Sequence, residues 1–266
     1  MKKSYENCRY SIVGYNCSCH CRFRTLLAHN THWYDKYEKA LKTAGTEERQ
    51  VTLPNGAITA AYIAAYGGKN IAGVVLEDPP VFSTEGEGWE ESFAYLDTYK
   101  PLHDWNQSEK GECWESYYLR HCYWGQLYMA DAMPGIADYA QKQYQKKPDE
   151  AVRIGFLPAS IWYVFEYARE YDFTYGERFY DLSWNHGLTH EGIFSAIEVP
   201  CVYIHAKENV HENGTYLCAA SREQAERAVS YIGDNCRLVE TENSDHVIHT
   251  AHSAFYIEAV NSLKSK

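Results

Sequence analysis

A short segment around residue 54 has the pattern of a catalytic turn but lacks the residue that would react. A β-prone run and a sharp turn occupy 51–56, and a helix of mostly small, apolar residues is predicted over 57–65. A strand, a tight turn and a helix form the nucleophile elbow, with the pattern small-x-nucleophile-x-small. Thr52 and Gly56 are the small flanks, so Pro54 holds the nucleophile position. Proline has no nucleophilic atom, and its ring fixes φ near about −65°, whereas an elbow nucleophile needs a strained, positive φ.

Cysteines and histidines near the amino terminus offer a second kind of chemistry, metal binding. Soft thiolates and imidazoles suit zinc, and the candidate ligands are Cys8, Cys17, Cys19, His20, Cys21, His29 and His32. The Cys-x-Cys-His-Cys order lacks the paired C-x₂-C spacing of a structural zinc site. We therefore expect an irregular segment with incidental cysteines, and no metal or cofactor. No cysteine lies on the elbow, and the Thr52 hydroxyl lies on the strand, so neither replaces the missing nucleophile.

The composition is that of a globular protein and excludes several classes of partner. The 266 residues are 45% hydrophobic and include 24 Tyr and 7 Trp, which favours an aromatic cavity or cap over disorder. A net charge of −11 disfavours nucleic acid and anionic membranes as partners. No apolar run reaches the roughly 18 residues of a membrane span. Nine cysteines without a framework favour a reducing compartment, so we expect a cytoplasmic protein.

Strand and helix patterns alternate on both sides of the elbow. The predicted strands are 49–53, 71–77, 200–206 and 237–241, and the predicted helices around them are 33–44, 57–65, 221–232 and 253–263. The run over 71–77 is apolar almost throughout, which is typical of a buried parallel strand, and Asp78-Pro79-Pro80 must end it. Ser221 and Gln224 have the spacing of a capping box. The alternation predicts an α/β fold with a mostly parallel sheet covered on both faces.

A region of different composition interrupts this alternation. Residues 81–195 hold six of the seven Trp and 13 of the 24 Tyr, with helical spacing and few strand signals. One helix is predicted across 117–128 and another across 161–171. The predicted domains are therefore an irregular, Cys-rich segment over 1–32, an α/β core over 33–80 and 196–266, and an aromatic-rich helical cap over 81–195.

Four segments resemble the α/β-hydrolase superfamily, in particular its cap-bearing, esterase-like members. They are Pro54-Asn55-Gly56-Ala57 opening a helix, GVVLEDPP over 73–80 before a cap, VPCVYIHA over 199–206 re-entering the sheet, and SDHVIH over 244–249 on the last loop. Their joint order and spacing, over roughly residues 33–266, carry the resemblance. It implies an α/β-hydrolase-type sheet with a helical cap insertion. Because only about 50 residues precede the elbow, it also implies a sheet that is incomplete on its N-terminal side, as in a truncated member.

The resemblance assigns roles to particular residues. His246 matches the general base, which takes a proton from the nucleophile and returns it to the leaving group. His249 on the same loop is expected to pack or cap. The position of the acid falls on Asn209, which carries no charge, so Glu208 and Glu212 are the candidates to replace it. The alternative is that both glutamates simply belong to a solvated, charged loop.

The oxyanion hole implied by the resemblance is incomplete. The backbone N–H of Asn55 would supply one donor, but residues 1–53 contain no His-Gly motif for the second. Losing one donor typically costs about 10²–10³ in kcat. Three interpretations follow: an ester- or acyl-hydrolysing enzyme by descent whose catalysis is lost or impaired, a binding protein for a small hydrophobic ligand or a protein partner, or a truncated and decayed gene product.

Overall fold

The computed structural model divides into two compact units. It describes residues 13–14, 51–52, 54–66, 71–156, 165, 173–185, 187–244 and 246–263. Unit 1 comprises the described residues within Met1–Val81, Leu188–Glu208 and Ala220–Lys266, and unit 2 comprises those within Phe82–Gly187 and Asn209–Ala219. The predicted helical cap over 81–195 differs from unit 2 in two respects, because unit 2 ends at Gly187 and also includes 209–219.

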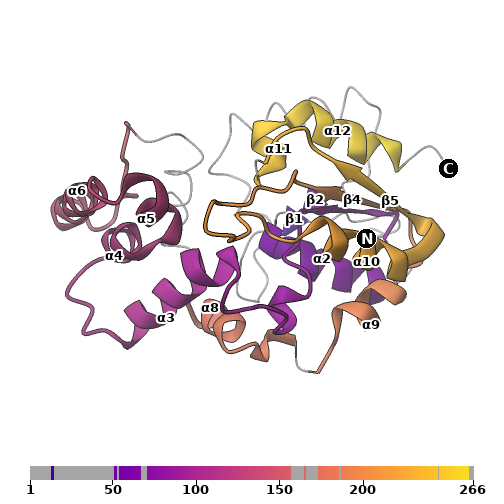
Figure 1. Cartoon of the computed structure of the whole chain (residues 1–266), viewed down its shortest axis with the longest axis horizontal. Coiled ribbons are helices and arrows are strands. Elements are labelled where there is room, and N and C mark those ends of the chain that lie inside the picture. Colours follow the sequence, from indigo (N-terminus) through magenta and orange to yellow (C-terminus); the bar gives the residue numbers. More distant parts are fainter. Residues whose placement is uncertain are drawn as a thin grey trace, which may run out of the picture. The chain divides into compact units, whose positions relative to one another are not determined.

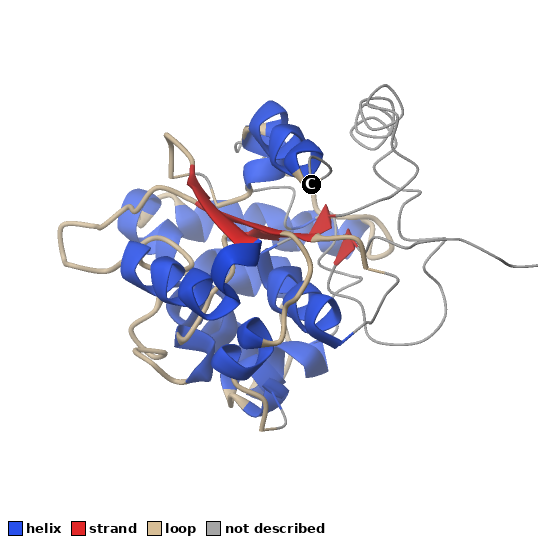
Figure 2. Cartoon of the chain, turned by 90° about the vertical axis from the view of Figure 1, so that its right-hand side faces the viewer, coloured by secondary structure: helices blue, strands red, loops and turns tan. Residues whose placement is uncertain are grey.

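Unit 1 is built on parallel strands. β3 (Val74–Glu77), β4 (Cys201–His205) and β5 (Cys236–Glu240) form one sheet in that order, and both pairings are parallel. β1 (Val13–Gly14) pairs in parallel with β2 (Val51–Thr52), and β2 lies next to β3. The predicted α/β class with a mostly parallel sheet is therefore confirmed (Figures 1 and 2).

The strands lie where the apolar runs predicted them, within a few residues at each end. Every residue of β3 and β4 is buried, as the near-continuous apolar runs indicated, whereas β5 is half-buried or exposed along its length. β3 is shorter than predicted, because the chain over 71–73 precedes the ladder without joining it. Its carboxyl end coincides with the predicted stop, since Glu77 is its last residue and Asp78-Pro79-Pro80 follows.

Helices cover both faces of this sheet. They are α2 (Pro54–Tyr66), α9 (His190–Ser195), α10 (Arg222–Ile232), α11 (Ile248–Ala251) and α12 (Ser253–Ser262), and a 3₁₀ turn, η5 (Gly233–Asn235), joins α10 to β5. α12 lies on one side of the sheet, and α2 and α10 lie on the other (Figure 1).

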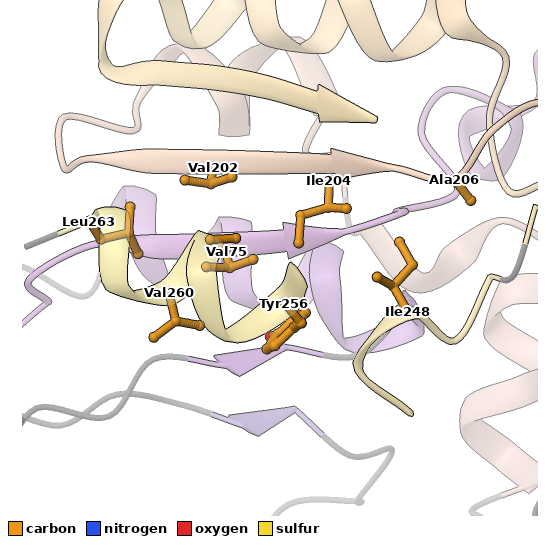
Figure 3. Packing of buried hydrophobic residues seen from close by; sticks show 9 residues of the cluster. Val75, Val202, Ile204, Ala206, Ile248, Tyr256, Val260 and Leu263 are labelled. Atoms are coloured by element: carbon orange, nitrogen blue, oxygen red, sulfur yellow. The ribbon is translucent and has the colours of Figure 1, made fainter. Parts of the chain in front are cut away.

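The core beneath α12 is a cluster of buried hydrophobic side chains. Tyr256 and Val260 of α12 pack against Val75 of β3 and against Val202 and Ile204 of β4, and all five residues are at most 2% exposed (Figure 3). Burying one such side chain contributes about 1.5–3 kcal/mol to folding. This cluster fixes α12, and with it the loop that precedes α12, against the sheet.

The start of α10 has the capping box that its sequence predicted. The Ser221 hydroxyl accepts a hydrogen bond from the backbone N–H of Gln224 at 3.1 Å, and the Gln224 side chain accepts one from the backbone N–H of Ser221 at 2.9 Å. Two backbone donors that helix geometry leaves free are thereby satisfied.

Unit 2 is helical. Its elements are the 3₁₀ helix η2 (Ser83–Glu85), the π-helix η3 (Tyr95–Tyr99), α3 (Lys100–Gln107), α4 (Trp114–His121), α5 (Tyr123–Met129), α6 (Met133–Lys146), α8 (Phe173–Tyr180) and the 3₁₀ helix η4 (Ser183–Asn185). Aromatic side chains fill much of the interior. For example, Tyr99 and Trp184 each stack on Phe179, and the ring centroids are 5.4 Å apart in both pairs. Trp89, Tyr95, Tyr99 and Trp114 are buried, whereas Tyr128 and Tyr139 are exposed, so part of the Tyr and Trp excess over 81–195 forms core.

The single helix predicted across 117–128 is wrong, because the chain breaks at Cys122 between α4 and α5. Cys122 has an extended backbone, with φ −63° and ψ 135°. The buried Asp97 carboxylate accepts a hydrogen bond from the backbone N–H of Trp124 at 2.7 Å, near the start of α5. A carboxylate at a helix amino terminus satisfies a free N–H and is favoured by the helix dipole, so a contact distant in sequence favours a new helix here.

Two predicted helices lie largely outside the described residues. The helix over 33–44 and the irregular segment over 1–32 fall there almost entirely, as does most of 161–171, where Phe165 alone is described and is helical and buried. Among the helices that the structure describes, none combines the length and apolar character needed to cross a membrane.

Candidate active site

Two consecutive acidic residues end the buried strand β3. Glu77 and Asp78 are both fully buried, like the apolar residues before them, although both carry carboxyl groups. The backbone N–H of Asp78 donates to the Ile204 carbonyl at 2.7 Å, which continues the ladder to β4 by one residue. Asp78 has φ 39°, in the left-handed region that non-glycine residues rarely adopt. Such strain is typically found at functional sites, where surrounding contacts hold the residue in place.

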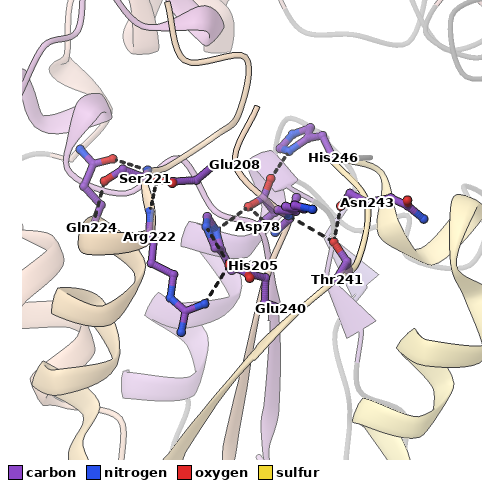
Figure 4. A network of polar contacts seen from close by, with 12 residues as sticks. Asp78, His205, Glu208, Ser221, Arg222, Gln224, Glu240, Thr241, Asn243 and His246 are labelled. Carbon is purple, nitrogen blue, oxygen red and sulfur yellow. Dashed lines mark hydrogen bonds and ion pairs between the residues drawn. The ribbon is translucent and has the colours of Figure 1, made fainter. Parts of the chain in front are cut away.

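Asp78 pairs with His246, the predicted general base. Nδ1–H of His246 donates to Oδ2 of Asp78 at 2.6 Å, across 168 positions in the sequence (Figure 4). The His246 side chain is 41% exposed, whereas that of Asp78 is 0% exposed. An imidazole bonded to a buried carboxylate through Nδ1 has its other nitrogen available as a base, which is the arrangement that acyl-transfer chemistry uses.

The loop that carries His246 is tied to the end of β4. The Thr241 N–H donates to the His205 carbonyl at 3.0 Å. The Lys207 N–H lies within hydrogen-bond distance of both the Asn243 carbonyl, at 3.2 Å, and the Thr241 hydroxyl, at 3.3 Å. These bonds hold the start of the 241–247 loop against the carboxyl end of the neighbouring strand. His246 is thereby brought over Asp78, which follows β3 at the same edge of the sheet.

The second oxygen of Asp78 is held by the residues at the end of β4. Oδ1 accepts the backbone N–H of Ala206 at 3.1 Å and lies 3.4 Å from Nδ1 of His205, which is fully buried. Burial by itself raises the pKa of Asp78, but the contact with His205 and the hydrogen bonds from His246 and the Ala206 N–H outweigh it, and the pKa is lowered below the usual value. Asp78 is therefore a carboxylate anion with a fixed orientation.

The Asp78 carboxylate raises the pKa of His246. Desolvation by itself lowers the pKa of the His246 imidazole, but the hydrogen bond and the negative charge of Asp78 act against it, and the pKa is raised above the usual value. An imidazolium on His246 is thus stabilised by Asp78, which is what a general base needs once it has accepted a proton.

The polar network extends from Asp78 to the surface. Nε2 of His205 lies 3.8 Å from Oε2 of Glu240 at the end of β5, and the guanidinium of Arg222 lies 3.0 Å from the same oxygen. The ends of β3, β4 and β5 thus carry Asp78, His205 and Glu240 side by side (Figure 4). Parallel strands place their carboxyl ends at one edge of a sheet, which is where α/β folds bind ligands.

Glu77 forms a second carboxylate–imidazole pair that is closed to solvent. Its Oε1 accepts the backbone N–H of His249 at 2.8 Å and Nδ1–H of the same residue at 2.9 Å. The side chains of Glu77 and His249 are 0% and 2% exposed. This contact anchors the start of α11, so His249 packs and caps, as the sequence analysis expected.

The two glutamates predicted as the acid have other surroundings. Glu208 is exposed, and its Oε1 accepts the backbone N–H of Arg222 at 2.7 Å, at the start of α10. Glu212 is exposed and belongs to the 209–219 segment of unit 2. Asn209, at the position aligned with the acid, accepts the Leu217 N–H at its carbonyl. Within the described part of the chain, the carboxylate hydrogen-bonded to His246 is that of Asp78.

The sequence analysis interpreted Asp78 only as the end of a strand. Two signals could have identified it as the acid. A carboxylate that directly follows a fully apolar buried strand must find partners, because burying an unpaired charge is costly. Asp78 also lies between the elbow and His246, so it satisfies the chain order nucleophile, acid, histidine.

Pro54 is the first residue of α2. β2 ends at Thr52, so a strand and a helix follow one another here, but the helix starts three residues earlier than predicted and includes residues 54–56 of the predicted turn. Proline is favoured at the first helical position, where a missing N–H costs nothing. Asn55 is the second residue of α2, where a backbone N–H has no acceptor within the helix. The chain before β2, where the second oxyanion donor was sought, is outside the described residues apart from β1.

The candidate zinc ligands over 8–32 also lie outside the described residues. Across the residues that the structure describes, no group of three or more His, Cys, Asp or Glu side chains is placed to hold a metal ion.

Comparison with known proteins gives similarity to solved structures only. No protein-family model matches the sequence, and no curated protein matches it. The enol-lactonase from Burkholderia xenovorans LB400 has a TM-score of 0.46 and 15% identity, covering 87% of this chain and 71% of that one. E-2-(acetamidomethylene)succinate hydrolase has a TM-score of 0.44 and 12% identity, and the match covers 89% of this chain and 74% of that one. The proline iminopeptidase of Mycobacterium smegmatis has a TM-score of 0.39 and 12% identity, and the match covers 86% of this chain and 68% of that one.

These solved structures are enzymes of the α/β-hydrolase fold. In this chain β3, β4 and β5 are parallel and lie in that order, the loop with His246 follows β5, and α12 follows that loop. By the direction and order of its own strands, the chain has an α/β fold with a mostly parallel sheet.

Proposed function

We propose that the protein is an α/β-hydrolase of the ester- or acyl-hydrolysing type by descent, which has lost covalent catalysis but keeps the acid–base pair. One observation carries this proposal. Asp78 and His246 are joined by a 2.6 Å hydrogen bond, while the elbow position at the start of α2 is occupied by Pro54.

The chemistry of the proposed site follows from what is present and what is missing. His246 can accept a proton, and Asp78 orients it and stabilises the charge that results. Covalent acyl transfer also needs a nucleophile whose proton His246 would remove, and proline supplies none. The site therefore provides an acid–base pair without an acyl-enzyme step.

A binding protein is the second candidate function. His246 is partly exposed beside an anionic carboxylate, so its imidazole can form hydrogen bonds with a bound carbonyl or hydroxyl group. A small, hydrophobic or ester-like molecule fits this chemistry. The cytoplasm is the compartment we propose, because Cys113, Cys122, Cys201 and Cys236 are thiols rather than disulfides in the described part of the chain.

Hydrolysis of short-chain aryl esters tests the loss of catalysis. We expect the wild type and His246→Ala to release the phenol at the same rate, equal to that of buffer with an inert protein. Both proteins should first be shown to be folded by circular dichroism. Turnover by the wild type that clearly exceeds that of His246→Ala would overturn the proposal.

A further inference from the structure

Two cysteines lie directly opposite each other on neighbouring strands, at the amino ends of the strands, whereas Asp78 and His246 lie at the carboxyl ends. Cys201 is the first residue of β4 and Cys236 is the first residue of β5, and the two are partners in the parallel register. Neighbouring strands lie about 4.7–4.9 Å apart. That spacing falls within the roughly 4.4–6.8 Å between Cα atoms that a disulfide spans.

The two thiols interact and differ in exposure. Cys201 is 3% exposed, and burial, together with the neighbouring Cys236 thiol, raises the pKa of the Cys201 thiol well above its usual value. Cys236 is half-buried and directly follows η5, whose residues Gly233, Asp234 and Asn235 are all exposed. A dissolved oxidant therefore reaches Cys236 first, with Cys201 behind it as the neighbouring thiol.

We propose that Cys201 and Cys236 form a reversible disulfide when the protein meets hydrogen peroxide, and that this bond links β4 to β5 at their amino ends. In the first step the Cys236 sulfur attacks the peroxide O–O bond, giving a sulfenic acid and releasing one water. In the second step the Cys201 sulfur displaces the hydroxyl from the Cys236 sulfur, giving the disulfide and a second water. Two thiols are oxidised and one peroxide is reduced.

The geometry favours a bond that is readily reduced again. Cys236 is half-buried at the start of β5, so a disulfide at this position stays within reach of a reductant. Strained or accessible disulfides have higher reduction potentials and are the labile, regulatory ones. In a reducing cytoplasm both cysteines therefore remain thiols until an oxidant is present.

Other cysteines provide internal controls. Cys113 and Cys122 are buried in unit 2, and burial raises the pKa of each thiol to about 12. They are therefore protonated at neutral pH and poor nucleophiles. We expect them to remain alkylatable after treatment that links Cys201 to Cys236.

Peptide mapping of the full chain tests the proposal. The folded protein is treated with a small excess of hydrogen peroxide, its free thiols are blocked with N-ethylmaleimide under denaturing conditions, and its peptides are identified by mass spectrometry. We expect a peptide pair joined through Cys201 and Cys236, lighter than the two thiol peptides by two hydrogen atoms. Dithiothreitol should separate the pair, while Cys113 and Cys122 appear as maleimide adducts.

Two variants sharpen the result. Cys236→Ser should give no linked peptide, and Cys201→Ser should leave Cys236 as a sulfenic acid that dimedone traps. The proposal is overturned if the wild type shows Cys236 oxidised to sulfinic acid without any linked peptide. It is also overturned if Cys236 is joined to another cysteine, or if it stays a free thiol while peroxide is consumed elsewhere in the chain. The wild-type map alone decides between these outcomes, even if a variant fails to fold.

Discussion

The properties of His246 as a base depend on how the Asp78 carboxylate is surrounded. Its two oxygens have separate partners, with His246 on Oδ2 and the Ala206 N–H and His205 on Oδ1. Because the carboxylate is buried and anchored on both sides, it can neither turn away nor gain a proton readily. The exposed imidazole therefore owes its raised pKa to a residue that solvent does not reach.

Replacing Asp78 should change the titration of His246 in a defined direction. We expect Asp78→Asn to lower the pKa of His246, since the charge and the hydrogen bond that raise it are removed while burial remains. NMR titration of the imidazole resonances measures this. Glu208→Gln is the matched control, because Glu208 bonds to the backbone of Arg222 instead. An unchanged His246 titration in Asp78→Asn would contradict the assignment of Asp78 as its partner.

The same pair should give stability a maximum at moderately acidic pH. The folded-state pKa of Asp78 is lowered, so its contribution is present above its unfolded value of about 3.9 and is lost as pH falls through the folded value. The folded-state pKa of His246 is raised, so its contribution is present below its unfolded value of about 6.5 and is lost as pH rises through the folded value. Both contributions are complete between about pH 4 and 6.5.

Urea unfolding at acidic, intermediate and alkaline pH measures this profile. The difference in unfolding free energy between the wild type and Asp78→Asn should be largest near pH 5.5 and smaller on both sides. A difference that grows steadily toward pH 9 would contradict the ion pair between Asp78 and His246.

At the scale of the elements, the sequence predicted what local patterns determine. The apolar runs located β3 and β4, Asp78-Pro79-Pro80 ended β3, and the Ser221–Gln224 spacing located the start of α10. The break at Cys122 was not predicted, because helical spacing continues across it and the carboxylate that caps α5 comes from Asp97, 27 positions earlier. The helical spacing around Cys122 is a local signal, so it contains no information about a hydrogen bond to a residue as distant as Asp97.

Substitutions of Asp97 test the break between α4 and α5. Its carboxyl group accepts hydrogen bonds from the Trp124 N–H and the Tyr118 hydroxyl, both at 2.7 Å, and burial raises its pKa. Because the folded-state pKa is raised, this group costs stability as pH rises from its unfolded value toward the folded one. Asp97→Asn removes that cost and keeps an acceptor, so we expect it to be at least as stable as the wild type at pH 8.

Asp97→Leu removes both hydrogen-bond acceptors from a buried site. We expect it to lower the unfolding free energy by about 1–3 kcal/mol, since a buried donor is left without its acceptor. Urea unfolding of the two variants side by side distinguishes charge from hydrogen bonding. Equal destabilisation in both would show that Asp97 does not act as a cap for α5.

At the scale of the whole molecule, the site is a product of topology. His246 was predicted from its place after the last strand, but the acid was sought at Glu208 and Glu212, and Asp78, 168 positions away from His246, was not considered for that role. The strand order β3–β4–β5 brings Asp78 and the 241–247 loop to one edge of the sheet, and the sequence does not display that adjacency directly. The proposed loss of the nucleophile, by contrast, depends on one residue type at one position and could be inferred from the sequence alone.

Labelling with a fluorophosphonate probe, read by intact mass, is the most direct test of an acid–base pair retained around a lost nucleophile. The probe should leave the wild type unmodified and add one equivalent to Pro54→Ser, because a serine at the proposed nucleophile position would supply the hydroxyl whose proton His246 removes. The label should be lost again in Pro54→Ser combined with His246→Ala. Labelling of the wild type, or no labelling of a folded Pro54→Ser protein, would contradict the account.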